Sequence, residues 1–124
     1  MSNLSEHKAI SIRPFIGAKD FNRSRSFYSD LGFSEIIISP SLSLYQWGEQ
    51  AFYLQDAYVK DWVDNTMLFF QVENVAQFFT ELVALNLTTK YPEVRIAPIR
   101  TESWGKECFL HDPSGILWHI GEFS

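Results

Sequence analysis

Cysteine is nearly absent from the sequence, and long apolar runs are missing. Cys108 is the only cysteine, so no internal disulfide can form, which is typical of a reducing compartment. With no activating base nearby in the sequence, we interpret it as a small buried apolar residue. No stretch approaches the roughly 20 apolar residues of a membrane-spanning helix, and residues 1–8 are polar. These features predict a cytoplasmic protein with no membrane partner.

Positive charge is also scarce. The 10 Lys and Arg residues against 15 Asp and Glu residues give a net charge of −5. This balance, together with the lack of a basic stripe or a glycine-rich phosphate loop, argues against a nucleic-acid partner. It favours a neutral or positively charged ligand. No Ser/His/Asp or Cys/His pattern has a supporting context.

Aromatic residues, by contrast, are abundant. The chain has 11 Phe, 5 Tyr and 4 Trp among 124 residues, and 46% of it is hydrophobic. This composition predicts one globular domain over residues 1–124. Because a single small core seldom needs so many rings, we expect some of them to line a pocket or an interface.

A strand followed by a capped helix occurs twice. An apolar strand begins at Ile10 and leads to Asp20, a helix N-cap, and Gly32 ends that helix. The inward stripe of the helix is Phe21, Tyr28 and Leu31.

The second copy begins at Met67. Asn74 is its N-cap, Gln77 completes a capping-box pattern, and Asn86 ends the helix. Both caps and both helix ends are 54 positions apart, which indicates a repeated unit. The second inward stripe is Val75, Phe78, Leu82 and Leu85.

Three strands are expected after each helix, at residues 34–39, 42–47 and 50–55, and at residues 94–100, 107–111 and 116–123. The predicted fold class is α+β, with two βαβββ modules at about 9–56 and 67–123. Residues 57–66 have no strong periodicity and form the linker. Two such mixed sheets side by side would make a curved surface with the helices outside and a cleft inside.

Two sets of residues carry a resemblance to a known family. Asp20, Phe27, Tyr28 and 31–33, with Asp112-Pro113-Ser114-Gly115, resemble the signatures of the vicinal oxygen chelate superfamily, which includes glyoxalase I, extradiol dioxygenases and bleomycin resistance proteins. The FYxxLGF helix end, Trp104-Gly105 and Leu117-Trp118 are most similar to the bleomycin resistance branch. The resemblance implies a homodimer with a ligand groove between subunits, walled in part by Trp62 and Trp104. Alternatively, these two residues pack a dimer interface.

The metal enzymes of that superfamily hold their ion with His or Glu residues on four inner strands. The corresponding positions here are Arg13, Met67, either Tyr53 or Gln55, and His119. Of these, only His119 is a plausible ligand, whereas a transition-metal site needs three or four donors. The sequence therefore predicts neither a metal nor another cofactor.

His111 could supply a second ligand only if it shared a face with His119. With residues 112–115 as a turn, His111 is expected to pair with Ile116. Alternation then places His119 in the cleft and His111 on the opposite face, and it turns Trp118 and Ile120 toward the helices. A two-histidine metal site is thus not expected.

The predicted ligand-binding residues are Arg13, Phe15, Tyr53, Gln55, Trp62, Met67, Phe69, Trp104 and His119. Such a surface could stack a flat ring system and bind its polar edges. Alternatively, Phe15 and Phe69 fill the cleft as core, and Arg13 pairs with Glu107 or Asp56.

The leading hypothesis is a bleomycin resistance protein-like homodimer that sequesters a bulky aromatic antibiotic or metabolite, neutral or cationic. The alternatives are a glyoxalase-type or dioxygenase-type enzyme, either with a metal or with His119 as general base, and a regulatory module whose cleft is filled.

Overall fold

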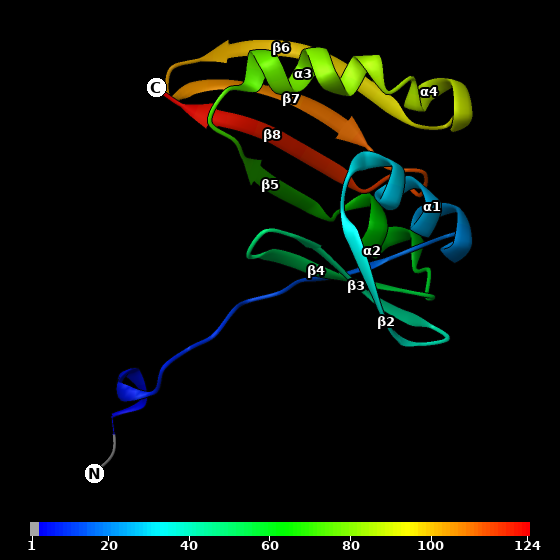
Figure 1. The fold of residues 1–124 in the computed structure, drawn as a ribbon, viewed down its shortest axis with the longest axis vertical. Coiled ribbons are helices and arrows are strands. Elements are labelled where there is room, and N and C mark those ends of the chain that lie inside the picture. The colour runs from blue at the N-terminus through cyan, green and yellow to red at the C-terminus, as the bar shows by residue number, and fades with distance from the viewer. Residues whose placement is uncertain (1–2) are drawn as a thin grey trace.

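The computed structural model describes residues 3–124 and contains two four-stranded sheets (Figure 1). The first sheet has the order β1-β4-β3-β2 and the second β5-β8-β7-β6. The strands are β1 Phe15–Gly17, β2 Ser34–Ser39, β3 Leu42–Trp47, β4 Gln50–Gln55, β5 Met67–Gln71, β6 Arg95–Glu102, β7 Gly105–His111 and β8 Leu117–Phe123. The helices are the 3-10 helix η1 Leu4–Glu6, and α1 Phe21–Leu31, α2 Lys60–Asp64, α3 Val75–Ala84 and α4 Leu87–Lys90.

Local hydrogen bonds place the two longer helices. The side chain of Asp20 accepts a hydrogen bond from the backbone N–H of Arg23 and so caps α1, and Asn74 caps α3 through the N–H of Gln77. Gly32 ends α1 at a φ of 126°, and Asn86, at a φ of 53°, separates α3 from α4. These caps and ends are as predicted.

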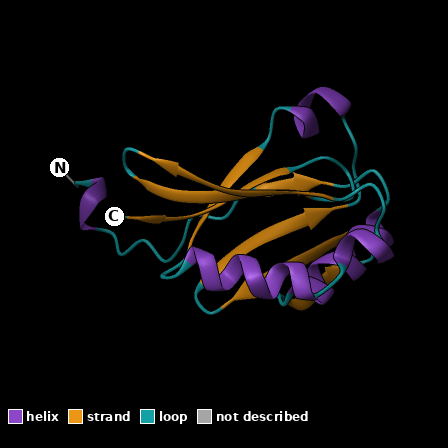
Figure 2. Ribbon diagram, turned by 90° about the horizontal axis from the view of Figure 1, so that it is seen from above, coloured by secondary structure: helices purple, strands orange, loops and turns teal. Residues whose placement is uncertain are grey.

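Each sheet has one face toward a helix and one face that carries no long helix. In the first sheet β1 runs parallel to β4, and in the second β5 runs parallel to β8, while all other neighbours are antiparallel. Figure 2 shows α1 and α3 on the same side of the strands. We call the opposite side of each sheet its open face. The architecture confirms the predicted α+β class with two βαβββ units.

A buried polar contact joins the two halves. The hydroxyl of Tyr28 on α1 donates to Oδ2 of Asp112 at 2.6 Å and accepts from Nε1 of Trp118 at 2.9 Å. The side chains of Phe33 and Phe52 also pack against Trp118. Because Trp118 belongs to β8 and the other rings to the first half, the two halves share one aromatic core.

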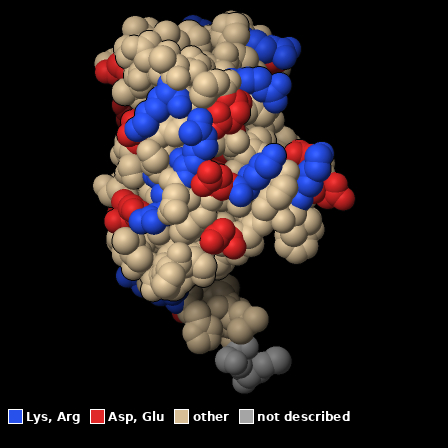
Figure 3. Space-filling view, turned by 90° about the vertical axis from the view of Figure 1, so that its right-hand side faces the viewer, with Lys and Arg blue, Asp and Glu red and all other residues tan. Residues whose placement is uncertain are grey.

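Charged side chains of both signs cover the side of the molecule seen in Figure 3. Salt bridges link α1 with α4 and the segment that follows it, namely Arg23 with Glu93 and Lys90 with Asp30. No single-sign patch appears on this side. None of the helices within residues 3–124 has the length and apolar content needed to cross a membrane.

Two sequence-based details are wrong. The first strand begins at Phe15, not at Ile10, and Figure 1 shows the preceding segment leaving the body of the molecule, with Ile12 98% exposed. Residues 10–14 thus alternate between apolar and polar side chains as a strand does, but they belong to none of the described strands. Leu85 is 48% exposed rather than part of the inward stripe, because α3 ends at Ala84 and Leu85 is already its C-cap.

Candidate functional site

An aromatic cluster lies on the open face of the second sheet. The ring of Phe69 on β5 lies 5.8 Å from Trp104, 5.6 Å from Phe123 and 6.5 Å from the imidazole of His119, between ring centroids. Strand pairing explains the arrangement, since Phe69 is directly opposite His119 on β8, and Phe123 is on the same face of that strand. Phe69 is 45% exposed and Phe123 is 57% exposed, so the cluster faces outward and is free to stack with a ligand.

His119 is held by a carboxylate from the neighbouring strand. Its Nδ1 lies 2.8 Å from Oε1 of Glu107, and Glu107 is buried. Because a carboxylate only accepts hydrogen bonds when ionised, this contact places a proton on Nδ1 of the imidazole. Phe109, directly opposite His119 on β7, packs edge-on at 5.1 Å. The site therefore contains one oriented imidazole between aromatic rings.

The prediction that His111 faces away from His119 is wrong. His111 pairs with Leu117 instead of Ile116, because the turn from Asp112 to Ile116 is one residue longer than expected. Since Leu117 and His119 alternate onto the same face, His111 also lies on the open face. Burial, with a smaller contribution from Arg95, lowers its pKa below the usual value. This favours the neutral imidazole.

The open face of the first sheet carries a second group of predicted residues. Phe15 on β1 stacks on Tyr53 of β4 with a centroid distance of 4.7 Å. Nη1 of Arg13 lies 3.4 Å from the hydroxyl of Tyr53. Gln55 and Trp62 line a small cavity of about 50 Å³ beside Phe15, and Trp62 is 70% exposed. Neither proposed partner of Arg13 pairs with it, and Glu107 is engaged by His119.

The remaining predicted residue, Met67, lies two residues before Phe69 on β5. It begins β5, opposite Leu117, and is 65% exposed. Its side chain is thus on the same face as Phe69. The structure brings together Phe69, Trp104 and His119 on one sheet, and Arg13, Phe15 and Tyr53 on the other.

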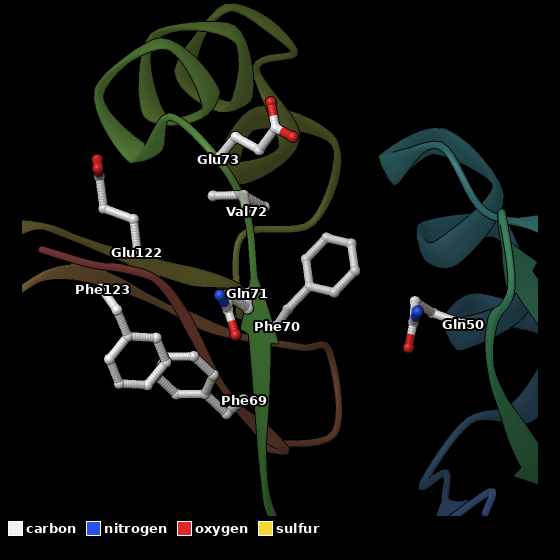
Figure 4. A pocket seen from close by; sticks show the side chains of 8 residues that line it. All are labelled: Gln50, Phe69, Phe70, Gln71, Val72, Glu73, Glu122 and Phe123. Carbon is white, nitrogen blue, oxygen red and sulfur yellow. The ribbon is translucent and has the colours of Figure 1, made fainter. Parts of the chain in front are cut away.

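A cavity of about 630 Å³ opens beside the aromatic cluster (Figure 4). Figure 4 shows Gln50, from the first half, across from the other lining side chains. The lining residues are Gln50, Phe69, Phe70, Gln71, Val72, Glu73, Glu122 and Phe123. Glu122 accepts a hydrogen bond from the N–H of Val75, while neither Glu73 nor Glu122 forms a salt bridge within residues 3–124. The cavity combines aromatic walls with negative charge and has the volume of a typical small-molecule site.

A smaller cavity of about 190 Å³ adjoins it between the two halves. Both cavities are lined by Gln50, Phe69 and Phe70. Arg13 lines only the smaller one. A single elongated ligand could therefore occupy both.

The residues at the four positions where the superfamily's enzymes hold their metal ion do not suit such an ion. Arg13 is a permanent cation, and Met67 offers only a soft thioether. His119 already engages Glu107 through one nitrogen. Within the described part of the chain, no three His, Cys, Asp or Glu side chains are grouped so that they could hold a metal ion.

Several lining residues were not predicted from the sequence. Alternation from His119 reaches Phe123, so that residue could have been inferred from β8 alone. Glu107 was considered only as a partner for Arg13. Gln50 and Glu73 carried no sequence signal, because one begins a strand and the other lies in a loop, and only packing of the two halves brings them to one cavity.

The arrangement of two βαβββ units with open faces is shared with solved structures. A bleomycin-binding protein complexed with bleomycin superposes with a TM-score of 0.77 and 19% identity, covering 92% of this chain and 98% of the other. The bleomycin-binding protein of bleomycin-producing Streptomyces verticillus, complexed with copper(II)-bleomycin, gives 0.80 and 18%, covering 95% and 99%. Lactoylglutathione lyase from Agrobacterium tumefaciens gives 0.68 and 17%, covering 93% and 95%.

The chain thus has the fold of bleomycin-binding proteins and of glyoxalase-type proteins. This confirms the fold that the sequence resemblance implied. No protein-family model and no curated protein sequence matches the chain.

Proposed function

We propose that this protein is a cytoplasmic homodimer that binds and sequesters a bulky aromatic compound without a metal of its own. The observation that carries the proposal is the cluster of Phe69, Trp104 and Phe123, whose two exposed phenylalanine rings line a cavity of about 630 Å³. Exposed rings in contact with one another are preorganised to stack with a flat ligand. Glu73 and Glu122 in the same cavity favour a ligand whose nearby group is positively charged.

A second copy of the chain would complete the site. Phe15, Trp62, Met67 and Phe69 are each at least 45% exposed, so the open faces present apolar area that a second subunit and a ligand together could cover. The bleomycin-binding proteins of the same fold supply the ligand precedent. We expect size-exclusion chromatography with light scattering to give twice the mass of 14.4 kDa. A monomer at micromolar concentration would remove the shared groove from the proposal.

The test of binding is a titration of chelator-treated protein with metal-free and with copper-loaded bleomycin, followed by tryptophan fluorescence. Trp104 and Trp62 are the expected reporters, since Trp118 is buried. We expect saturable quenching near one ligand per subunit with the metal-free compound. A flat titration would exclude this antibiotic, and a response only with copper would contradict binding that does not depend on a metal.

A metal-free enzyme is the second candidate, and the contact of 2.8 Å between His119 and Glu107 favours it. A carboxylate that orients an imidazole is the arrangement of a general base. Mass spectrometry of the compound after incubation with the protein separates the two functions. Recovery of the unchanged compound supports sequestration, and a product that is lost in His119→Gln supports catalysis.

A further inference from the structure

Arg13 is a cation at the junction of the two halves with no salt-bridge partner in residues 3–124. Its Nε is buried and is the only buried side-chain nitrogen or oxygen of the described residues without a hydrogen-bond partner. Its one side-chain hydrogen bond among the described residues, to the hydroxyl of Tyr53, is long at 3.4 Å.

A buried Nε–H without an acceptor is costly at such a place. A buried donor that has left water without finding an acceptor lowers stability. Buried polar groups in folded proteins are nearly always paired, so an exception needs an explanation. A carboxylate supplies the missing partner best, because its two oxygens can accept parallel hydrogen bonds from the guanidinium.

The surroundings indicate what carries that carboxylate. The cavity of about 190 Å³ that Arg13 lines is walled by aromatic side chains, namely Phe33, Phe52, Phe69, Phe70 and Trp118. Glu49 also lines it but forms no salt bridge with Arg13. Apolar walls strengthen an ion pair by excluding water, and they select a ring as the body of the ligand.

We propose that Arg13 is an anion subsite and that the ligand carries a carboxylate on an aromatic ring. This inference rests on the proposed function. It gives the ligand a negatively charged group, whereas the net charge of −5 favoured a neutral or positively charged ligand. The ring lies in the smaller cavity, with the carboxylate on Arg13. The rest of the compound extends past Gln50 and Phe69 into the larger cavity, where Glu73 and Glu122 receive any positive group.

The test compares 2-naphthoate with 2-naphthamide, which have the same ring but differ in charge, by isothermal titration calorimetry. The proteins are the wild-type chain, Arg13→Gln, and the matched control Arg100→Gln, which removes an exposed arginine already paired with Glu102. We expect the wild type and the control to bind the acid at least about tenfold more tightly than the amide, as a charge-assisted pair requires. In Arg13→Gln the two affinities become similar.

Equal affinities of the wild type for acid and amide, or a preference that survives in Arg13→Gln, would overturn the proposal. If neither naphthalene compound binds while bleomycin does, the anion subsite is wrong and the proposed function stands. If bleomycin fails as well, both fall. If Arg13→Gln does not fold, Arg13→Lys replaces it. We expect this variant to keep a preference for the acid over the amide, but a weaker one than the wild type has.

A second copy of the chain could also supply the missing carboxylate. Size-exclusion chromatography of wild type and Arg13→Gln decides this alternative. An unchanged oligomeric state supports a ligand subsite. A variant that dissociates would assign Arg13 to a subunit contact and overturn the proposal.

Discussion

Replacing Asp112 by alanine should destabilise the protein more than any surface change. Asp112 is 1% exposed. Its Oδ1 accepts hydrogen bonds from the backbone N–H groups of Ser114, Gly115 and Ile116 at 2.8–2.9 Å, and its Oδ2 accepts the Tyr28 hydroxyl at 2.6 Å. One side chain thus holds the β7–β8 turn and fastens it to α1.

The expected loss can be estimated from the groups left behind. In Asp112→Ala, the N–H of Ile116 and the hydroxyl of Tyr28 remain buried without an acceptor, at about 1–3 kcal/mol each. The N–H groups of Ser114 and Gly115 are only part-buried and can bind water. Burial raises the pKa of Asp112, which shows that desolvation of the carboxylate offsets part of the gain. We therefore expect a loss of about 2–4 kcal/mol in the free energy of unfolding.

Urea unfolding followed by far-UV circular dichroism measures this loss, with an expected fall in Tm of roughly 10 °C in a parallel thermal scan. Asp112→Asn is the matched milder change, because its amide oxygen still accepts from the turn and only the Tyr28 hydroxyl loses its acceptor, and it should lose about 1–2 kcal/mol. The exposed Asp56, replaced by alanine, is the surface control. If Asp112→Ala lies within about 1 kcal/mol of the wild type, the turn is not held as described.

Three further predictions concern separate parts of the molecule. The hydrogen bond from Arg25 holds the pKa of Glu35 below its usual value, so Glu35 adds stability that is present above about pH 4.5 and is lost as the pH falls through the lowered pKa. Glu35→Gln should accordingly flatten the dependence of the urea midpoint on pH between about 5 and 3, and an unchanged slope would contradict this pairing. Burial raises the pKa of Cys108 to about 11, so a thiol reagent at pH 8 should modify the chain only in urea, and rapid labelling of the folded protein would refute burial. Trp104→Ala should weaken bleomycin binding at least about fivefold while leaving the unfolding midpoint nearly unchanged, and an unaltered affinity would remove Trp104 from the site.

The two longer helices, α1 and α3, and most strands could be predicted because their signals are local, whereas the short helices α2 and α4 were not predicted. An N-cap such as Asp20 bonds an N–H three residues away, and Gly32 needs only its own φ to end a helix. The repeat spacing and the turn at residues 112–115 then led to the fold. The first strand was less predictable, because its length depends on pairing with β4 and not on the apolar residues before it.

The site depended on more than local signals. The wrong placement of His111 arose from a single residue in the turn, since an offset of one reverses every side chain of a strand. Gln50 and Phe70 meet at one cavity only because the two halves pack together. No spacing along the chain encodes such a contact.

The sequence by itself determined the caps, the repeat and the residue types that a metal site would need, because each depends on near neighbours or on composition. Only the tertiary structure decided that Glu107 pairs with His119 and that Arg13 has no salt-bridge partner within residues 3–124. Both outcomes depend on distances between strands, and the register and packing of the whole fold set those distances.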